Sequence, residues 1–353
     1  MNTTALTPLP ARPNLEQYKK QAKERLKSAR ASARETPSTL AGAQSEIALE
    51  HGFASWPKFA SHLNALARAH SPVSRFEAAA DAVVSGDAET LKSLLAADPE
   101  LIRARSSRLH GAMLLHYVGA NGFENWRQKT PPNAVEILRI LLQAGAPVDA
   151  GGAMYGLGTT LGLVATSVWP KLAGVQNELL QVLLDAGASP DGAPGGWNPL
   201  DAALANGRPE AAVFLAAHGA RVSFIGAAGI GRVDLLDQYF HTGAPSQHEI
   251  DIGFGHACQY GRTGAVEYLL GKGANLRHEE GTGMPPLHWA IVGEQVETVK
   301  LLLARGAGRE ARNVYGGDAL GACEWRAANG GNAERCAAIA RMLLPTVEVP
   351  HGQ

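Results

Sequence analysis

Histidine and cysteine are the most reactive side chains in this sequence, but neither type is arranged in an established catalytic or metal-binding pattern. The three cysteines form no CxxC pair, and the motifs HExxH, GxSxG and GxxxxGK[ST] are absent. Zinc sites, activated nucleophiles and phosphate loops need such spacings because several groups must converge on one atom. We therefore expect no catalytic residue, no metal ligand and no cofactor.

A glycine-rich segment, Tyr155 to Gly162, invites comparison with a dinucleotide-binding loop. Its glycines do not have the GxGxxG spacing, and no predicted strand precedes them. A similar segment runs from Tyr315 to Gly321. Both segments are therefore interpreted as turns, and Tyr155 and Tyr315 become candidate binding residues at the turn tips.

Composition indicates a packed and soluble protein. Lys and Arg (32) nearly balance Asp and Glu (33), and charged residues make up 18% of the 353 residues, which excludes a highly charged disordered chain. The N-terminal segment lacks the apolar core of a secretory signal, and no apolar stretch reaches the roughly 18 residues of a membrane span. With three cysteines, a disulfide scaffold is also excluded. We expect a cytoplasmic location.

Glycine is abundant, with 40 residues, and it recurs in one phrase, two aliphatic residues followed by two spacers and Gly-Ala. The steps between the glycines of successive phrases are 42, 32, 24, 30 and 33 residues, so the period is near 33. These marker glycines are Gly145, Gly187, Gly219, Gly243, Gly273 and Gly306.

A second phrase precedes the marker glycine by 18 residues, most clearly in Pro-Leu-His-Trp-Ala, whose His288 lies 18 residues before Gly306. The two phrases resemble the ankyrin repeat, in which a turn and a short helix opening with Thr-Pro-Leu-His precede a second helix ending in Leu-Leu-x-x-Gly-Ala. The resemblance implies an all-α repeat solenoid, a turn plus two antiparallel helices per unit, preceded by a small helical module. About eight units are expected over residues 73–345, with atypical terminal units.

The marker glycines have a physical reason to recur. A residue that ends a helix in the left-handed conformation is usually glycine, since a side chain there costs about 1 kcal/mol or more. We predict that each marker glycine caps the second helix of its unit.

By the same resemblance, first-helix residues that follow the histidine position face the concave side of the array. Aromatic and polar side chains at such positions are common binding anchors. His116 and His288 hold the histidine position itself, where imidazole serves the hydrogen bonds of the turn. Cys258 and Cys323 hold positions where buried alanine is usual. The predicted concave residues are Tyr117, Asn121, His256, Gln259, Tyr260, Trp289 and Trp325.

Two insertions interrupt the repeat between the first and second helices of neighbouring units, near residues 123–133 and 168–175. Adjacent units of a solenoid place equivalent loops side by side. We expect the insertions to form one Trp-rich basic ridge that either covers helix ends or borders a binding site. The candidate residues are Trp126, Arg127 and Trp169, and Trp197 in the next turn is added to them.

The segment ahead of the array, residues 14–70, is predicted to be a basic helical module. Apolar side chains recur every three or four residues from Leu15 to Ala33, and eight basic against two acidic residues between Arg12 and Arg34 give a local charge of +6. Further helices are expected at 42–50 and 56–68, the latter capped by Ser55. The string HGFASWPKF resembles a helical module found before bacterial ankyrin arrays. Residues 1–13 and 346–353 are expected to be a flexible N-terminus and a tail.

The basic stripe has two interpretations, a solvated helix face or a contact with acidic protein, nucleic acid or a membrane surface. Nucleic acid is not favoured, since no DNA-binding or RNA-binding motif accompanies the stripe. For the whole chain, we expect a protein partner bound through the concave face and the turn tips. The alternative is an ankyrin-scaffolded enzyme or small-molecule binder, whose pocket is lined by concave His, Tyr and Trp and closed by the insertions.

Overall fold

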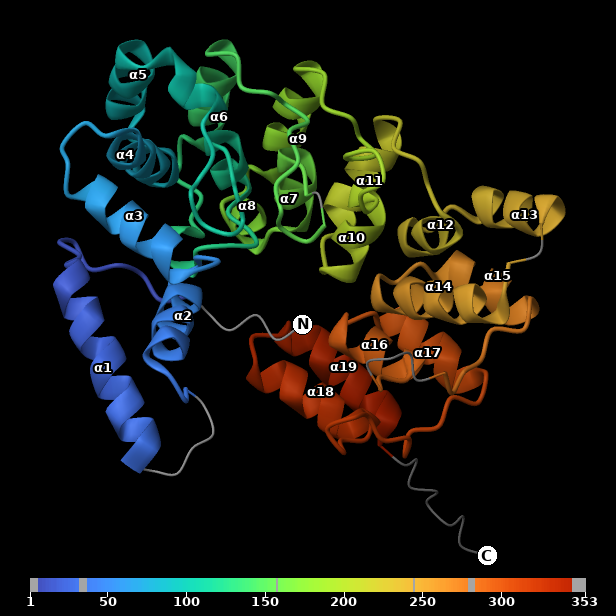
Figure 1. The fold of residues 1–353 in the computed structure, drawn as a ribbon. Coiled ribbons are helices and arrows are strands. Elements are labelled where there is room, and N and C mark those ends of the chain that lie inside the picture. Colours follow the sequence, from blue (N-terminus) through green and yellow to red (C-terminus); the bar gives the residue numbers. More distant parts are fainter. Residues whose placement is uncertain (1–5, 32–36, 157, 244, 279–282, 345–353) are drawn as a thin grey trace, which may run out of the picture. The chain divides into compact units, whose positions relative to one another are not determined.

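The chain folds into helices joined by turns, and no β-strand occurs among the described residues of this computed structural model (Figure 1). The structure describes residues 6–31, 37–156, 158–243, 245–278 and 283–344. Two compact units divide the chain, residues 1–219 and 220–353. The predicted all-helical repeat architecture is thus confirmed in its secondary structure.

Unit 1 begins with a three-helix module whose core is aromatic. Tyr18 and Ala22 of the first helix are buried against Phe53 and Phe59, which explains the apolar spacing seen in the sequence. Ser55 precedes the third helix as predicted, but its side chain makes no capping hydrogen bond. The module helices are α1 (Leu15–Ala31), α2 (Leu40–Glu50) and α3 (Trp56–Leu66).

The N-terminal segment that we expected to be flexible lies against this module where it is described. The backbone N–H of Thr7 donates to the carbonyl oxygen of Glu50 at 2.8 Å, and His51 Nδ1 lies 2.8 Å from the carbonyl oxygen of Thr7. Residues 1–5 and the predicted tail, 346–353, lie outside the described residues.

The rest of unit 1 contains successive helix pairs. In each pair the first helix packs on the first helix of its neighbour, and the second helices stack in the same way. The pairs are α4 (Pro72–Ser85) with α5 (Ala88–Ala97) and the 3₁₀ turn η1 (Pro99–Arg103), η2 (Leu114–Gly119) with α6 (Ala134–Gln143), α7 (Thr160–Thr166) with α9 (Gln176–Asp185), and α10 (Pro199–Ala205) with α11 (Pro209–Ala217). The insertions form η3 (Asn125–Arg127) and α8 (Val168–Leu172).

Unit 2 repeats the same arrangement over one continuous apolar core. Small residues such as Ala257 and Ala290 are fully buried between first helices, while Leu269 and Leu302 fill the core from second helices. The helix pairs are α12 (Phe224–Ile230) with α13 (Val233–Thr242), α14 (Gln247–Gln259) with α15 (Thr263–Gly271), α16 (Pro286–Val292) with α17 (Val296–Ala304), and α18 (Ala319–Ala328) with α19 (Ala333–Leu343).

Five of the six marker glycines adopt the predicted left-handed conformation, with φ between 86° and 91° at Gly145, Gly187, Gly219, Gly273 and Gly306. Gly243 is the exception, because its φ of 177° is extended backbone that any residue can adopt. The prediction is therefore wrong for Gly243, which ends the shortened repeat. At this position the chain leaves α13 without the usual left-handed residue.

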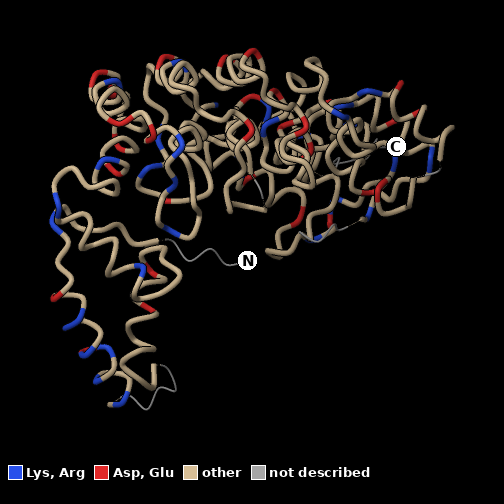
Figure 2. The backbone as a smooth tube through the Cα atoms, turned by 45° about the horizontal axis from the view of Figure 1, so that its top comes forward, with Lys and Arg blue, Asp and Glu red and all other residues tan. Residues whose placement is uncertain are grey.

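Lysine and arginine follow α1 along its length in Figure 2. None of the helices in the described ranges combines the length and apolar composition that a membrane span requires.

Candidate interaction site

The histidines at the repeat position serve the turns, as predicted. His116 Nδ1 accepts a hydrogen bond from the N–H of Met113 at 3.1 Å, which leaves the proton on Nε2 to donate to the carbonyl oxygen of Ala150 at 2.8 Å. Burial lowers the pKa of His116 to about 4. His288 Nε2 lies 3.2 Å from the carbonyl oxygen of Gly317 in the following turn. These imidazoles therefore connect neighbouring repeats rather than act on a ligand.

In unit 2 the predicted concave residues lie on three first helices, α14, α16 and α18, which pack against one another in that order (Figure 1). His256 and Tyr260, four residues apart, are stacked with ring centroids 6.0 Å apart and planes 7° apart. Burial lowers the pKa of His256, so its imidazole is neutral at physiological pH. A neutral, partly buried ring pair of this kind can contact apolar or hydrogen-bonding groups of a binding partner.

The same helices approach closely at their C-terminal ends. A methyl group added at Gly293, the residue that ends α16, would clash with the carbonyl oxygen of Gln259 on α14. Gln295 Nε2 donates to that same oxygen at 3.2 Å. The backbone contact therefore fixes Gln259 and, beside it, Tyr260.

Large aromatic side chains remain exposed in unit 2. Trp325 on α18 is 56% exposed and Tyr315 in the turn before it is 89% exposed, while Trp289 is half-buried. Exposed aromatic groups are typical of interaction surfaces. In unit 1 the corresponding turn residue, Tyr155, is 55% exposed. It adopts the left-handed conformation, with φ of 48°.

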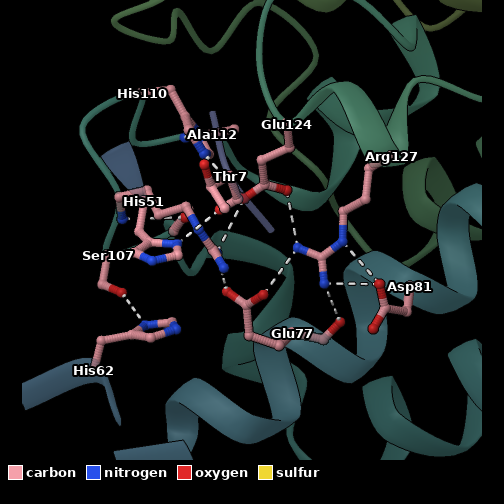
Figure 3. Close-up of polar contacts among 12 residues, drawn as sticks. Thr7, His51, His62, Glu77, Asp81, Ser107, His110, Ala112, Glu124 and Arg127 are labelled. Carbon is pink, nitrogen blue, oxygen red and sulfur yellow. Dashed lines mark hydrogen bonds and ion pairs between the residues drawn. The ribbon is translucent and has the colours of Figure 1, made fainter. Parts of the chain in front are cut away.

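The first insertion of unit 1 turns inward and forms a closed ring of buried charges (Figure 3). Arg127 Nη1 lies 2.9 Å from both Glu77 Oε2 and Glu124 Oε2. Arg108 Nη1 completes the ring, because it pairs with Glu77 Oε1 and lies 3.0 Å from Glu124 Oε1. These four side chains are at most 12% exposed, whereas Asp81, which also pairs with Arg127, is 66% exposed.

Arg127 and Tyr117 are therefore not where the sequence predicted them. The inward turn of the insertion buries Arg127, which does not lie on an exposed basic ridge. Tyr117 is 2% exposed, so it does not line an open groove. Phe123 of the insertion packs edge-on against the Tyr117 ring, and the guanidinium of Arg127 lies over the face of the Tyr117 ring. The inserted residues cover a position that is open in an uninterrupted repeat.

The charge ring fixes the ionisation of its members. Burial would raise the pKa of Glu124, but a hydrogen bond from His110 and the charges of Arg108 and Arg127 outweigh it and lower that pKa to about 2. His110 Nδ1 accepts from the N–H of Ala112 at 3.0 Å, so Nε2 carries the proton and donates to Glu124. Both imidazole nitrogens of His110 and the Glu124 carboxylate are thus hydrogen-bonded or ion-paired within this chain.

The loop that carries Arg108 also attaches the module to the array within unit 1. The N–H of Leu109 donates to the carbonyl oxygen of Gly52 at 2.8 Å, and Arg108 lies over the Phe53 ring at 5.5 Å. Ser107 Oγ lies 2.7 Å from His62 Nδ1 on α3. The module and the first repeats are therefore joined through buried polar groups.

A pocket of about 540 Å³ borders the charge ring. Its walls include the proline-rich segment from Pro8 to Pro13, the end of α3 and Trp126. The ring residues Glu77, Arg108 and Arg127 also line it, together with Asp81. Trp126 therefore lies at this pocket.

The second insertion, α8, forms an ion pair with the following repeat. Lys171 pairs with Glu210 of α11 at 3.0 Å, and Trp169 is 42% exposed. Asn121 Nδ2 donates to Thr166 Oγ1 at 2.7 Å, which joins the two inserted repeats at the bases of their insertions. Trp197 packs over Gly162 and is partly buried.

Cysteine contributes no reactive site in the described residues. Cys258 and Cys323 are buried, as predicted, and burial raises the pKa of both thiols. No cluster of His, Cys, Asp and Glu suited to a metal ion occurs in the part of the chain that the structure describes.

The charge ring was missed from the sequence. Glu77 and Asp81 are four residues apart on α4, and Glu124 and Arg127 are three apart in the insertion, so each pair lies on one side of its own segment. The spacing within each pair was the only hint of the ring in the sequence. It does not show that the charges on α4 lie next to those of the insertion.

Comparisons with known proteins identify the repeat. A family model for ankyrin repeats, in three copies, matches residues 227–323, which run from α12 into α18. Among solved structures, the human ASB11 ankyrin repeat domain aligns with 77% of this chain and 97% of its own length, with 22% sequence identity and a TM-score of 0.38. No curated protein matches the sequence.

Proposed function

We propose that this chain binds a protein partner through the first-helix face of α14, α16 and α18 and the adjoining turn tips, since residues 227–323 match a model for ankyrin repeats, which generally mediate protein–protein interaction. The contact residues are His256, Gln259, Tyr260, Trp289, Tyr315 and Trp325.

One observation carries this proposal, namely the exposed aromatic side chains of Tyr315 and Trp325 and the half-buried side chain of Trp289, which lie within or directly after the matched repeats. Aromatic residues contribute large contact area with few rotatable bonds and dominate the energetics of many interfaces. The close packing at Gly293 adds rigidity, and a preformed surface loses less conformational entropy on binding.

The enzyme alternative has less support in the geometry around the first insertion. A general base must have a free lone pair directed at a substrate proton. Tyr117, one of the concave residues that would line such a pocket, is 2% exposed beneath Phe123 of the insertion, and His110, which packs edge-on against Tyr117, has both ring nitrogens in hydrogen bonds within the protein.

Quantitative co-purification with the full chain as bait tests the proposal. The binding variant is Tyr260→Ala with Trp289→Ala, and the matched control is Glu297→Ala with Lys300→Ala, two exposed positions on the second helix α17. We expect the binding variant to reduce partner recovery at least about tenfold, since interface aromatics often contribute more than ~1.4 kcal/mol each, and the control to retain it.

Circular dichroism checks that both variants remain folded. A partner recovered equally by the wild-type chain and the folded Tyr260/Trp289 variant would show that this face is not the binding surface.

A further inference from the structure

The exposed side of α1 carries a straight line of cations. Lys20, Lys23, Lys27 and Arg30 are spaced by three, four and three residues, so they project from one side of the helix over about 15 Å. All four are exposed. Tyr18, Ala22 and Ala29 occupy the opposite side and are buried in the module core.

These cations form no ion pair within the described residues. Other basic groups of α1 are paired, since Lys19 contacts Glu16 at 2.7 Å and Arg25 contacts Glu50 at 2.6 Å. No ion pair joins Lys20, Lys23, Lys27 or Arg30 to any described carboxylate. Four like charges held close together repel one another unless a counter-charge is bound.

From this geometry we propose that the four side chains form a docking site for an acidic helical segment of a partner protein. Carboxylates spaced by three or four residues on a helix repeat at the same distances as these cations and would oppose them one for one. The four residues are different from the contact residues proposed in unit 2, so either proposal can fail without the other.

Other polyanions fit the surface less well. Recognition of single-stranded nucleic acid uses aromatic groups that stack on bases, but the exposed residues beside the stripe are Gln17, Gln21, Glu24 and Ser28. A membrane surface is bound stably when apolar side chains or a lipid add to the charge, and the apolar side of α1 is buried.

The experiment measures binding of the full chain to a labelled helical peptide that carries glutamate at positions i, i+3, i+7 and i+10. A rearranged peptide of the same composition distributes the glutamates around the helix. The stripe variant replaces Lys20, Lys23, Lys27 and Arg30 by Gln, which keeps helix propensity. The control variant replaces four exposed cations of unit 2, Lys300, Arg305, Arg309 and Arg335, by Gln.

At about 20 mM salt, where screening is weak, the wild-type and control chains are expected to bind the ordered peptide at least about tenfold more tightly than the stripe variant. They are also expected to prefer the ordered peptide over the rearranged one. Two half-variants, Lys20/Lys23→Gln and Lys27/Arg30→Gln, should each give an intermediate loss and guard against a folding defect.

Three results would overturn the proposal. The first is equal binding of the ordered peptide by the wild-type chain and the stripe variant, or no binding by either. The second is no preference between the two peptides. The third is tighter stripe-dependent binding of duplex DNA, single-stranded RNA or phosphatidylserine vesicles than of the ordered peptide.

Discussion

Glu77 and Arg127 lie 50 residues apart in the sequence, and their side chains meet at 2.9 Å in the interior of the first unit. The pair is one side of the closed ring that Arg108 and Glu124 complete. Removing one partner of a buried charge destabilises the folded state, because the remaining ion loses its hydration without gaining an ion pair in return.

Arg127→Ala is expected to lower the free energy of unfolding by about 3–5 kcal/mol, since it leaves Glu77 and Glu124 with one cation between them. The control is Arg139→Ala, which removes an exposed pair with Glu178 at 3.6 Å and should cost about 0–1 kcal/mol. Urea denaturation followed by tryptophan fluorescence gives both values. Similar losses for the two variants would contradict a structural role for the ring.

Gly273 and Gly243 provide a matched test of helix capping in unit 2. Added side chains meet no neighbour within 4 Å at either position, so only the backbone conformation differs. Gly273→Ala must hold φ of 91° and should destabilise by about 1 kcal/mol, whereas Gly243→Ala should be neutral or stabilising. Thermal unfolding midpoints measure the difference, and equal midpoints would remove the capping assignment.

Gly293→Ala tests close packing rather than backbone conformation. Its φ of −76° suits any residue, but its new methyl group would clash with the carbonyl oxygen of Gln259. We expect destabilisation by about 1–3 kcal/mol, as for other overpacked sites. Gly271→Ala, at the end of α15 with open space around it, should be neutral or stabilising and serves as the control. Equal unfolding midpoints for the two variants would exclude the contact.

Acid should weaken the first unit between pH 6.5 and pH 4 through His62. Burial lowers its folded pKa to about 4, so the unfolded chain binds the proton first and stability falls as the pH drops, by up to about 1.4 kcal/mol per pH unit. Below pH 4 this contribution is constant.

Urea midpoints at several pH values compare the wild-type chain with His62→Gln. The variant is expected to lose less stability across this range, with the slope from His116 remaining because its pKa is also about 4. His218→Gln, an exposed histidine, is the control. An unchanged slope in His62→Gln would show that His62 is not the group responsible.

Local and periodic features of the fold were predictable from the sequence. Repeat phrases located both helices of the matched units, and the Leu-Leu-x-x-Gly-Ala ending predicted the left-handed glycines except Gly243. His116 and His288 were correctly assigned to the hydrogen bonds of turns because both occupy the histidine position of the repeat phrase. Apolar spacing likewise placed Tyr18 and Ala22 in the module core.

Contacts within the interrupted repeats were not predictable. The resemblance treats Tyr117 as an open position, but the insertion that follows folds back over it with Phe123 and Arg127. This insertion turns inward toward charges that lie outside it in the sequence. They are Glu77 on α4 and Arg108 in the loop between η1 and η2. Periodicity carries no information about such pairs.

The closed charge ring also ties the first two repeats to each other, because its ions come from both of them. Pairs such as α14 with α15 contact their neighbours through apolar surfaces of similar form, so duplication or loss of a pair can leave a continuous core. Between Glu77 and Arg127 a duplication or deletion would separate ions that must be buried together. We therefore expect the folded chain to tolerate the removal or duplication of a helix pair beyond the first two repeats better than within them.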